Sequence, residues 1–155
     1  MPRLDGLPVK MQAVLRAQPV AEYDSSPDAG PVTLASARVA LVTSAGLHER
    51  ADQPFTREDP SFRVISSKAS AEDLVQSHTS IGFDRTAMQR DINVVFPIDR
   101  LRELEAEGVI GERAPRYLSF MGAQHDPEAV LASSAAAAAE ELLRDRVDVV
   151  LLTPT

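Results

Sequence analysis

Residues 38–46 read RVALVTSAG, and residues 147–154 read VDVVLLTP. Each stretch is a short run of apolar, largely β-branched side chains that ends in a turn signal, Ser44-Ala45-Gly46 in the first and Pro154 in the second. Runs of this kind are typical of strands buried on both faces of a parallel sheet. The two stretches therefore predict the first and last strands of such a sheet.

The segment between these strands contains the clearest predicted helix, residues 97–107, PIDRLRELEAE. Asp99 can cap its start, and Gly108 is a suitable stop after its last turn. Three apolar side chains share one face at helical spacing: Ile98, Leu101 and Leu104. This helix is expected to pack against the sheet.

A second helix is predicted over residues 126–144, where Pro127 suits the first turn and a run of alanines has high helix propensity. Weaker strands are predicted at 62–65 and 92–96, and short helical segments at 9–17 and 70–74. This order of elements predicts an α/β fold with three layers, a mostly parallel sheet with helices on both faces, incomplete at the C-terminus. Residues 1–37 form a lead-in, and residues 38–155 form the domain.

Composition limits the function. The 155 residues carry a net charge of −7, which would repel a phosphate backbone, so we expect no nucleic-acid partner. No apolar run is long enough for a membrane span, and the first residues lack the apolar core of a secretory signal. A cytoplasmic protein is expected.

The chain contains no cysteine, so it has neither disulfides nor a thiol nucleophile.

The carboxyl ends of parallel strands are where open α/β sheets usually carry their sites. Ser44 and Gly46 follow the first predicted strand, and Thr153 ends the last one, so these residues are candidates for substrate contact. Gly46 has no glycine-rich phosphate motif around it and is equally compatible with a simple turn. Ser44, Ser77 and Thr79 show no partner order typical of a catalytic triad.

The histidines are candidates for acid–base chemistry. His48 follows the first strand by a short turn and fits a proton donor, a substrate ligand or an exposed loop residue. His78 lies in SHTSIGFD, residues 77–84, where Asp84 can orient its ring; both are assigned catalytic roles. His125 is interpreted as an ordinary loop residue. The histidine spacing matches no compact metal motif, and we predict no metal site.

Arg63 has two interpretations. Its guanidinium could clamp a substrate carboxylate, or it could form a simple ion pair with Asp59 at the surface. The first interpretation makes Arg63 a candidate substrate-binding residue.

Five segments resemble, in the same order, the selenoprotein B family of glycine/sarcosine/betaine reductases and D-proline reductase. Together they span roughly residues 38–155. They are VALVTSAGLH (39–48), DPSFRVI (59–65), SHTSIGFD (77–84), DINVVFPIDRLRELEAEGVIG (91–111) and VDVVLLTP (147–154).

The resemblance implies the substrate-reducing subunit of an oxidoreductase, acting on X–H and Y–H bonds with a disulfide as acceptor. A selenolate or thiolate attacks a small amino acid or amine that a pyruvoyl-bearing partner subunit has activated, and a C–N bond is broken. Partner subunits and an oligomeric assembly are implied as well.

The sequence departs from this family at its end. The family places selenocysteine, or sometimes cysteine, directly after the strand that ends in LLTP, whereas this sequence stops at Thr155. The expectation is a UGA codon that was read as a stop, with selenocysteine just after Thr155. The chain alone would then be inactive.

Two alternatives stay open at this stage. The chain could be a non-catalytic α/β module that binds a small molecule or a partner. It could also keep the family scaffold and act on another substrate, because a scaffold does not fix a substrate.

Overall fold

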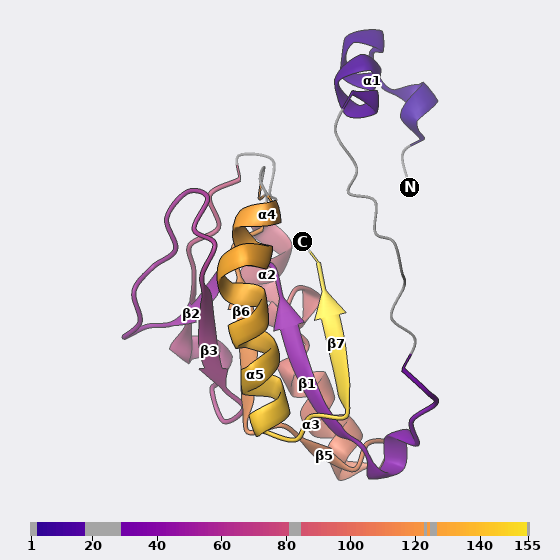
Figure 1. The fold of residues 1–155 in the computed structure, drawn as a ribbon, viewed down its shortest axis with the longest axis vertical. Coiled ribbons are helices and arrows are strands. Elements are labelled where there is room, and N and C mark those ends of the chain that lie inside the picture. Colours follow the sequence, from indigo (N-terminus) through magenta and orange to yellow (C-terminus); the bar gives the residue numbers. More distant parts are fainter. Residues whose placement is uncertain (1–2, 18–28, 81–84, 123, 125–126, 155) are drawn as a thin grey trace. The chain divides into compact units, whose positions relative to one another are not determined.

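The structure is a computed structural model that describes residues 3–17, 29–80, 85–122, 124 and 127–154. It divides into two units, Met1–Pro31 and Val32–Thr155, and each is described by itself. The first unit holds a 3-10 turn, Leu4–Gly6, and the helix α1, Val9–Arg16, shown in indigo in Figure 1. The predicted helical segment at 9–17 is confirmed.

The second unit is built on a five-stranded sheet. Its central strand is β1, Arg38–Thr43, which pairs in parallel with three other strands. On one side lies β7, Val149–Thr153, and on the other lie β5, Glu112–Arg113, and β6, Arg116–Phe120. The fifth strand is β3, Phe62–Ser66, antiparallel to β6. The mostly parallel sheet is confirmed.

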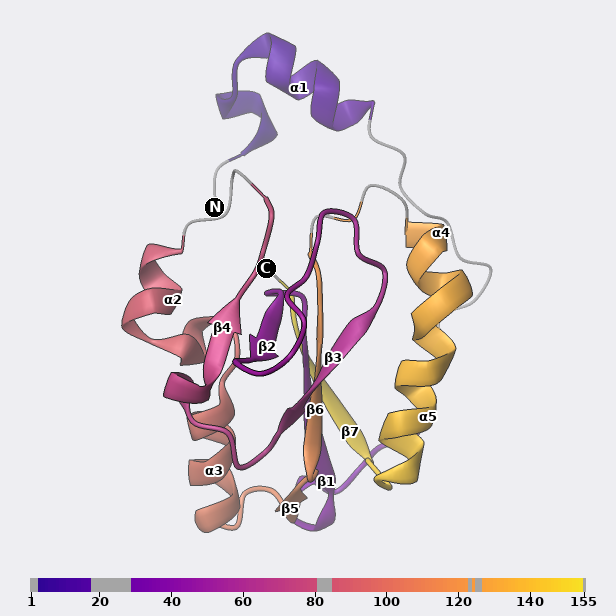
Figure 2. The ribbon, with the colours of Figure 1, turned by 90° about the vertical axis from the view of Figure 1, so that its left-hand side faces the viewer.

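Helices cover both faces of this sheet, as Figure 2 shows. One face carries α2, Thr86–Arg90, and α3, Ile98–Ala106. The other carries one continuous helical rod made of α4, Pro127–Val130, a π-helical turn, Leu131–Ala135, and α5, Ala136–Arg144. The predicted three-layer α/β architecture is therefore confirmed.

The core explains how these layers hold together. The apolar face predicted for α3 is buried, with Ile98 0% and Leu101 2% exposed. Beneath it, Phe96 meets Tyr117 of β6 edge-on, with ring centroids 5.8 Å apart. On the opposite face, Arg116 of β6 forms ion pairs with two carboxylates of the α5 end, Glu141 and Asp145. Each helix is thus fixed to the sheet by a different kind of contact.

A small antiparallel ribbon lies beside the main sheet. It pairs β2, Leu47–Glu49, with β4, Leu74–Gln76, in a register that places His48 opposite Val75. A 3-10 turn, Ala71–Asp73, leads into β4 and confirms the helical turn predicted at 70–74. Neither ribbon strand was predicted, because each has only three residues.

Two local predictions are wrong. Residues 92–96 do not form a strand; Ile92–Val94 is a 3-10 turn whose start is capped when the Asp91 carboxylate accepts a hydrogen bond from the Asn93 amide. Three of its apolar side chains, Ile92, Val95 and Phe96, are buried in the core without joining a ladder, while Val94 is exposed. Asp99 is not the cap of α3 either, because Pro97 occupies that position and the Asp99 amide donates to the Asn93 side chain.

Candidate active site at the carboxyl end of the sheet

The parallel strands β1, β6 and β7 end at the same edge of the sheet, where a mainly apolar hollow of about 300 Å³ opens. Two of the predicted substrate-binding residues, Ser44 and Thr153, lie in its wall. The complete lining is Val42, Thr43, Ser44, Phe120, Leu152, Thr153 and Pro154. We refer to it as the strand-end hollow.

The buried hydroxyl of Thr43 fixes this edge. It donates to the carbonyl oxygen of Val95 at 2.9 Å and accepts from the amide of Ala45 at 3.2 Å. The amide of Ser44 donates to the carbonyl of Thr153 at 3.3 Å, which continues the pairing of β1 and β7 past the end of the strand. The hollow therefore has a wall fixed by hydrogen bonds.

Gly46 joins the sheet to the ribbon. Its amide donates to the Phe120 carbonyl at 2.9 Å, and its own carbonyl accepts from the Ser77 amide at the same distance. Its φ of +64° lies in the left-handed region, and an added Cβ would lie 3.1 Å from the Cα of His78. This position requires glycine for both reasons. Its substrate-binding role remains a prediction.

The ribbon brings His48 to Ser77. His48 is 3% exposed, and its Nδ1 lies 2.8 Å from the carbonyl oxygen of Glu49. Because that oxygen only accepts hydrogen bonds, the tautomer with its proton on Nδ1 fits this contact. Nε2 is then an acceptor, and the Ser77 hydroxyl donates to it at 2.7 Å. Sequence reasoning missed this pair because the two residues are 29 positions apart.

His78 is the second buried histidine of this region, with 2% exposure. Its Nδ1 accepts a hydrogen bond from the Ser80 amide at 3.2 Å, and its backbone carbonyl accepts one from the Arg85 guanidinium. Burial lowers the pKa of His78 below 6.5, and the positive charge of Arg85 lowers it further. A neutral ring is therefore favoured. Asp84, the predicted orienting carboxylate, lies outside the described residues, as does His125.

The Arg63 side chain is held by residues that are close to it in the sequence. Its guanidinium lies 4.2 Å from the ring centroid of Phe55 and donates to the Gln53 carbonyl, the Ser61 hydroxyl and the Asp59 carboxylate. The ion pair with Asp59 spans 3.0 Å, with side chains only 13% and 14% exposed. Burial alone would raise the pKa of Asp59, but hydrogen bonds from Ser61 and Arg63 and the charge of Arg63 bring it below its ordinary value.

The predicted site residues thus form three groups. Gly46, His48 and His78 gather where the ribbon meets β6, and Ser44 and Thr153 line the strand-end hollow. Arg63, as far as the chain is described, directs its hydrogen bonds to residues 53–62. The clamp that it was predicted to provide remains a prediction.

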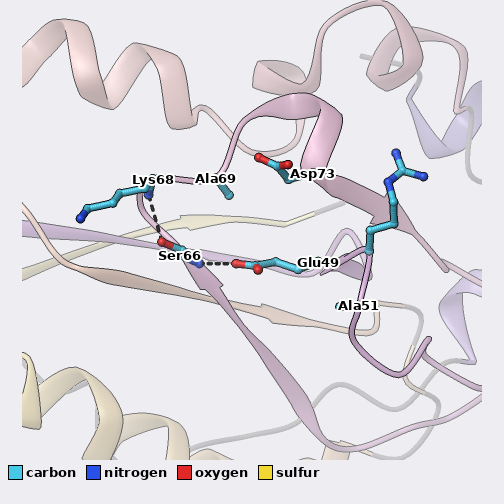
Figure 3. Close-up of a pocket in the computed structure, with 7 residues that line it drawn as sticks. Glu49, Ala51, Ser66, Lys68, Ala69 and Asp73 are labelled. Carbon is cyan, nitrogen blue, oxygen red and sulfur yellow. Dashed lines mark hydrogen bonds between the residues drawn. The ribbon is translucent and has the colours of Figure 1, made fainter.

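A second hollow, of about 390 Å³, lies between the end of β2 and the end of β3 and was not predicted. Figure 3 shows the Glu49 carboxylate at its centre, where it accepts a hydrogen bond from the Ser66 amide at 2.8 Å. The lining carries both signs of charge, with Arg50 and Lys68 as cations and Glu49 and Asp73 as anions. The lining of this charged pocket is Glu49, Arg50, Ala51, Ser66, Lys68, Ala69 and Asp73.

The rim of the charged pocket is partly fixed. Asp73 forms a capping box with Ser70, whose backbone amide and hydroxyl lower the pKa of the Asp73 carboxyl. The Arg50 guanidinium donates to the Glu72 carbonyl at 2.8 Å. Lys68 is exposed, as Arg50 is, and Figure 3 shows the backbone amide of Lys68 bonded to the Ser66 hydroxyl.

Two kinds of feature are absent from the described residues. They contain no group of three or more His, Cys, Asp or Glu side chains arranged to hold a metal ion. No helix within the described ranges has both the length and the apolar character to cross a membrane.

The fold and the site together define an open-sheet α/β protein whose candidate site lies beyond the carboxyl ends of its parallel strands. The chain belongs to the glycine/sarcosine/betaine reductase selenoprotein B family, whose pattern matches residues 11–155. The family resemblance found in the sequence is thereby confirmed.

Three relatives illustrate this membership. The chain is 43% identical over 126 residues to D-proline reductase subunit gamma of Acetoanaerobium sticklandii, covering 79% of this chain and 51% of that protein. It is 34% identical over 95 residues to sarcosine reductase complex component B subunit beta of Peptoclostridium acidaminophilum, covering 57% and 21%. It is 31% identical over 142 residues to glycine reductase complex component B subunit gamma of Symbiobacterium thermophilum, covering 88% and 33%.

The chain thus spans about half the length of the D-proline reductase subunit and a third or less of the other two. No solved structure matches it.

Proposed function

We propose that this chain forms part of a reductase subunit that cleaves a C–N bond in a small amino acid or amine. The observation that carries the proposal is the family match over residues 11–155. It is supported by the strand-end hollow, whose wall contains Ser44 and Thr153 at the ends of β1 and β7. Substrates of this class are small enough for a hollow of about 300 Å³.

The chemistry requires a chalcogen nucleophile. We place a selenocysteine or cysteine just after Thr155, as the family resemblance implies, since the 155 residues contain no cysteine. The selenolate or thiolate attacks the carbon that bears the nitrogen, and the electron pair of the C–N bond leaves with the nitrogen, which takes up a proton. A dithiol then supplies two electrons to release the reduced product and becomes a disulfide.

A pyruvoyl-bearing partner subunit completes the proposal. A keto group of this kind condenses with an amine and makes its nitrogen a better leaving group. Two relatives are components of sarcosine and glycine reductase complexes, which supports an assembly of several subunits.

The test begins with the gene. Sequencing roughly thirty codons beyond the codon for Thr155, about one βα unit, should show an in-frame UGA or cysteine codon that is followed by further coding sequence. The protein read through that codon is then combined with the partner subunit. We expect dithiol oxidation that depends on glycine, sarcosine, betaine or D-proline. No turnover of any of the four by the complete assembly would contradict the proposal.

A second candidate function, a non-catalytic binding module, is favoured by the charged pocket. Its lining combines two cationic residues, Arg50 and Lys68, with two carboxylates, Glu49 and Asp73, a mixture of charges that suits a zwitterion. Calorimetric titration of the chain with glycine should then show binding that Lys68→Met weakens. Lys10→Met is the matched control, since Lys10 lies in the other unit. Equal binding of glycine by both variants would exclude the charged pocket as its binding site.

A further inference from the structure

The pair formed by His48 and Ser77 has the three parts of an activated hydroxyl. Ser77 provides the oxygen, Nε2 of His48 accepts its proton at 2.7 Å, and the Glu49 carbonyl holds Nδ1 at 2.8 Å. A base within hydrogen-bond reach of a hydroxyl, oriented in turn by a third group, is the signature of a serine nucleophile. Here a backbone carbonyl takes the orienting place that a carboxylate has in a triad.

The backbone holds both members of the pair. His48 belongs to β2, whose register with β4 sets it opposite Val75. Ser77 follows β4 directly, and its amide donates to the Gly46 carbonyl at 2.9 Å. Strand pairing therefore sets the backbone positions from which the Oγ–Nε2 hydrogen bond forms, and the contact of Nδ1 with the Glu49 carbonyl orients the ring.

Burial differs between the two side chains in the way that catalysis requires. His48 is 3% exposed, so before acylation the lone pair of Nε2 is directed at the Ser77 hydroxyl and not at bulk water. Ser77 is only half-buried, so part of this residue faces solvent. With its proton directed at the ring, Oγ has lone pairs left to attack an electrophile.

We propose that Ser77 is an activated nucleophile, with His48 as its base, that accepts acyl groups from small, activated carboxylic esters. The activity is separate from the reductase function proposed above, because it uses no chalcogen and no partner subunit.

The step balances as an acyl transfer. Oγ of Ser77 bonds to the carbonyl carbon while its proton moves to Nε2 of His48. The bond from that carbon to the alcohol oxygen breaks, and the departing oxygen takes the proton back from Nε2. Water then attacks the acyl-serine with His48 as base, which releases the carboxylic acid and restores the hydroxyl.

The first test is labelling of the full chain with diisopropyl fluorophosphate, followed by mass spectrometry of peptides. We expect the label on Ser77, no label there in Ser77→Ala, and a rate at least about 100-fold lower in His48→Gln, the range for loss of a general base. Ser133→Ala is the matched control, since its exposed hydroxyl donates only to a backbone carbonyl, that of Ala129. It should label as the wild type does.

A second test avoids any loss of fold in His48→Gln. The chain has no cysteine, so Ser77→Cys introduces a single thiol beside the imidazole. Its alkylation by iodoacetamide at neutral pH should be at least about tenfold faster than that of Ser133→Cys, because a neighbouring imidazole favours the thiolate. Equal alkylation rates, or fluorophosphate labelling of Ser77 no faster in the folded chain than in urea, would overturn the proposal.

Discussion

A β-carbon on Gly46 would lie 3.1 Å from both the Cα and the backbone nitrogen of His78. The glycine therefore determines how closely the segment after β4 approaches the turn that follows β1. Its left-handed φ of +64° gives the turn its direction, and the amide of Gly46 holds Phe120 at the end of β6. The histidine region and the sheet edge meet at this one residue.

Gly46→Ala should therefore lower the free energy of unfolding by about 2–4 kcal/mol, the sum of a left-handed alanine and a steric displacement. Gly108→Ala is the matched control: its φ is +70°, but nothing lies within 4 Å of an added Cβ. It should cost only about 1–2 kcal/mol. Urea unfolding of both variants measures the difference, and equal losses would show that the contact with His78 is unimportant.

The lowered pKa of His78 predicts a pH dependence of stability. Because burial and Arg85 disfavour the charged ring in the folded state, the unfolded chain binds more protons as the pH falls below 6.5. Stability contributed by the neutral ring is complete above that value and is lost on acidification. The slope from this one group cannot exceed about 1.4 kcal/mol per pH unit.

The measurement is the free energy of unfolding of the wild type and of His78→Gln between pH 7.5 and 5. The wild-type value should fall more steeply than that of the variant. Carboxyls with lowered pKa, such as Asp59 and Glu105, act at lower pH because their ordinary values are 3.8 and 4.5. Parallel curves for the two proteins would contradict the assignment to His78.

The parts of the fold that could be predicted are those set by local patterns. The run at residues 38–43 became β1 with the same bounds, and the spacing of Ile98 and Leu101 placed α3 correctly. β6, Arg116–Phe120, was not predicted, because a polar Ser119 interrupts its apolar run. Ser119 is 0% exposed, and its hydroxyl accepts a hydrogen bond from the Leu47 amide, a partner from a distant segment.

The candidate site, too, could be predicted only where local sequence patterns determine it. The position of Ser44 and Thr153 follows from where two strands end, which a sequence pattern can indicate. The contact between His48 and Ser77 depends on the register of β2 and β4, two strands too short to leave a periodic signal. A polar pair created by long-range strand pairing becomes visible only in three dimensions.

Arg63→Lys should destabilise the domain by about 2–3 kcal/mol. An ammonium group cannot reproduce the planar fork that bonds Gln53, Ser61 and Asp59 while lying over Phe55, and the largely buried Asp59 would lose its best donor. Arg57→Lys is the control, because its ion pair with Glu58 spans 3.8 Å between exposed side chains. It should change stability by less than about 0.5 kcal/mol.

Thermal and urea unfolding of these two arginine variants separate the two interpretations of Arg63. If it acts mainly as a support for its loop, Arg63→Lys lowers stability in the absence of any ligand. If its main role is to clamp a substrate carboxylate, the ligand-free variant should be as stable as Arg57→Lys, and only substrate binding should suffer.

Thr43→Val tests how far the strand-end hollow depends on one buried hydroxyl. The substitution keeps the shape of the side chain but leaves the Val95 carbonyl without its donor and the Ala45 amide without its acceptor. A buried polar group without a hydrogen-bond partner costs about 1–3 kcal/mol. We therefore expect the free energy of unfolding, measured in urea, to fall by about 2–4 kcal/mol. Thr153→Val is the control from the same wall, since its hydroxyl reaches only the Val42 carbonyl, at 3.5 Å. It should lose less than about 1 kcal/mol.

Similar losses in the two variants would mean that strand pairing alone holds the carboxyl edge of the sheet. The Thr43 hydroxyl would then have no special part in shaping the hollow.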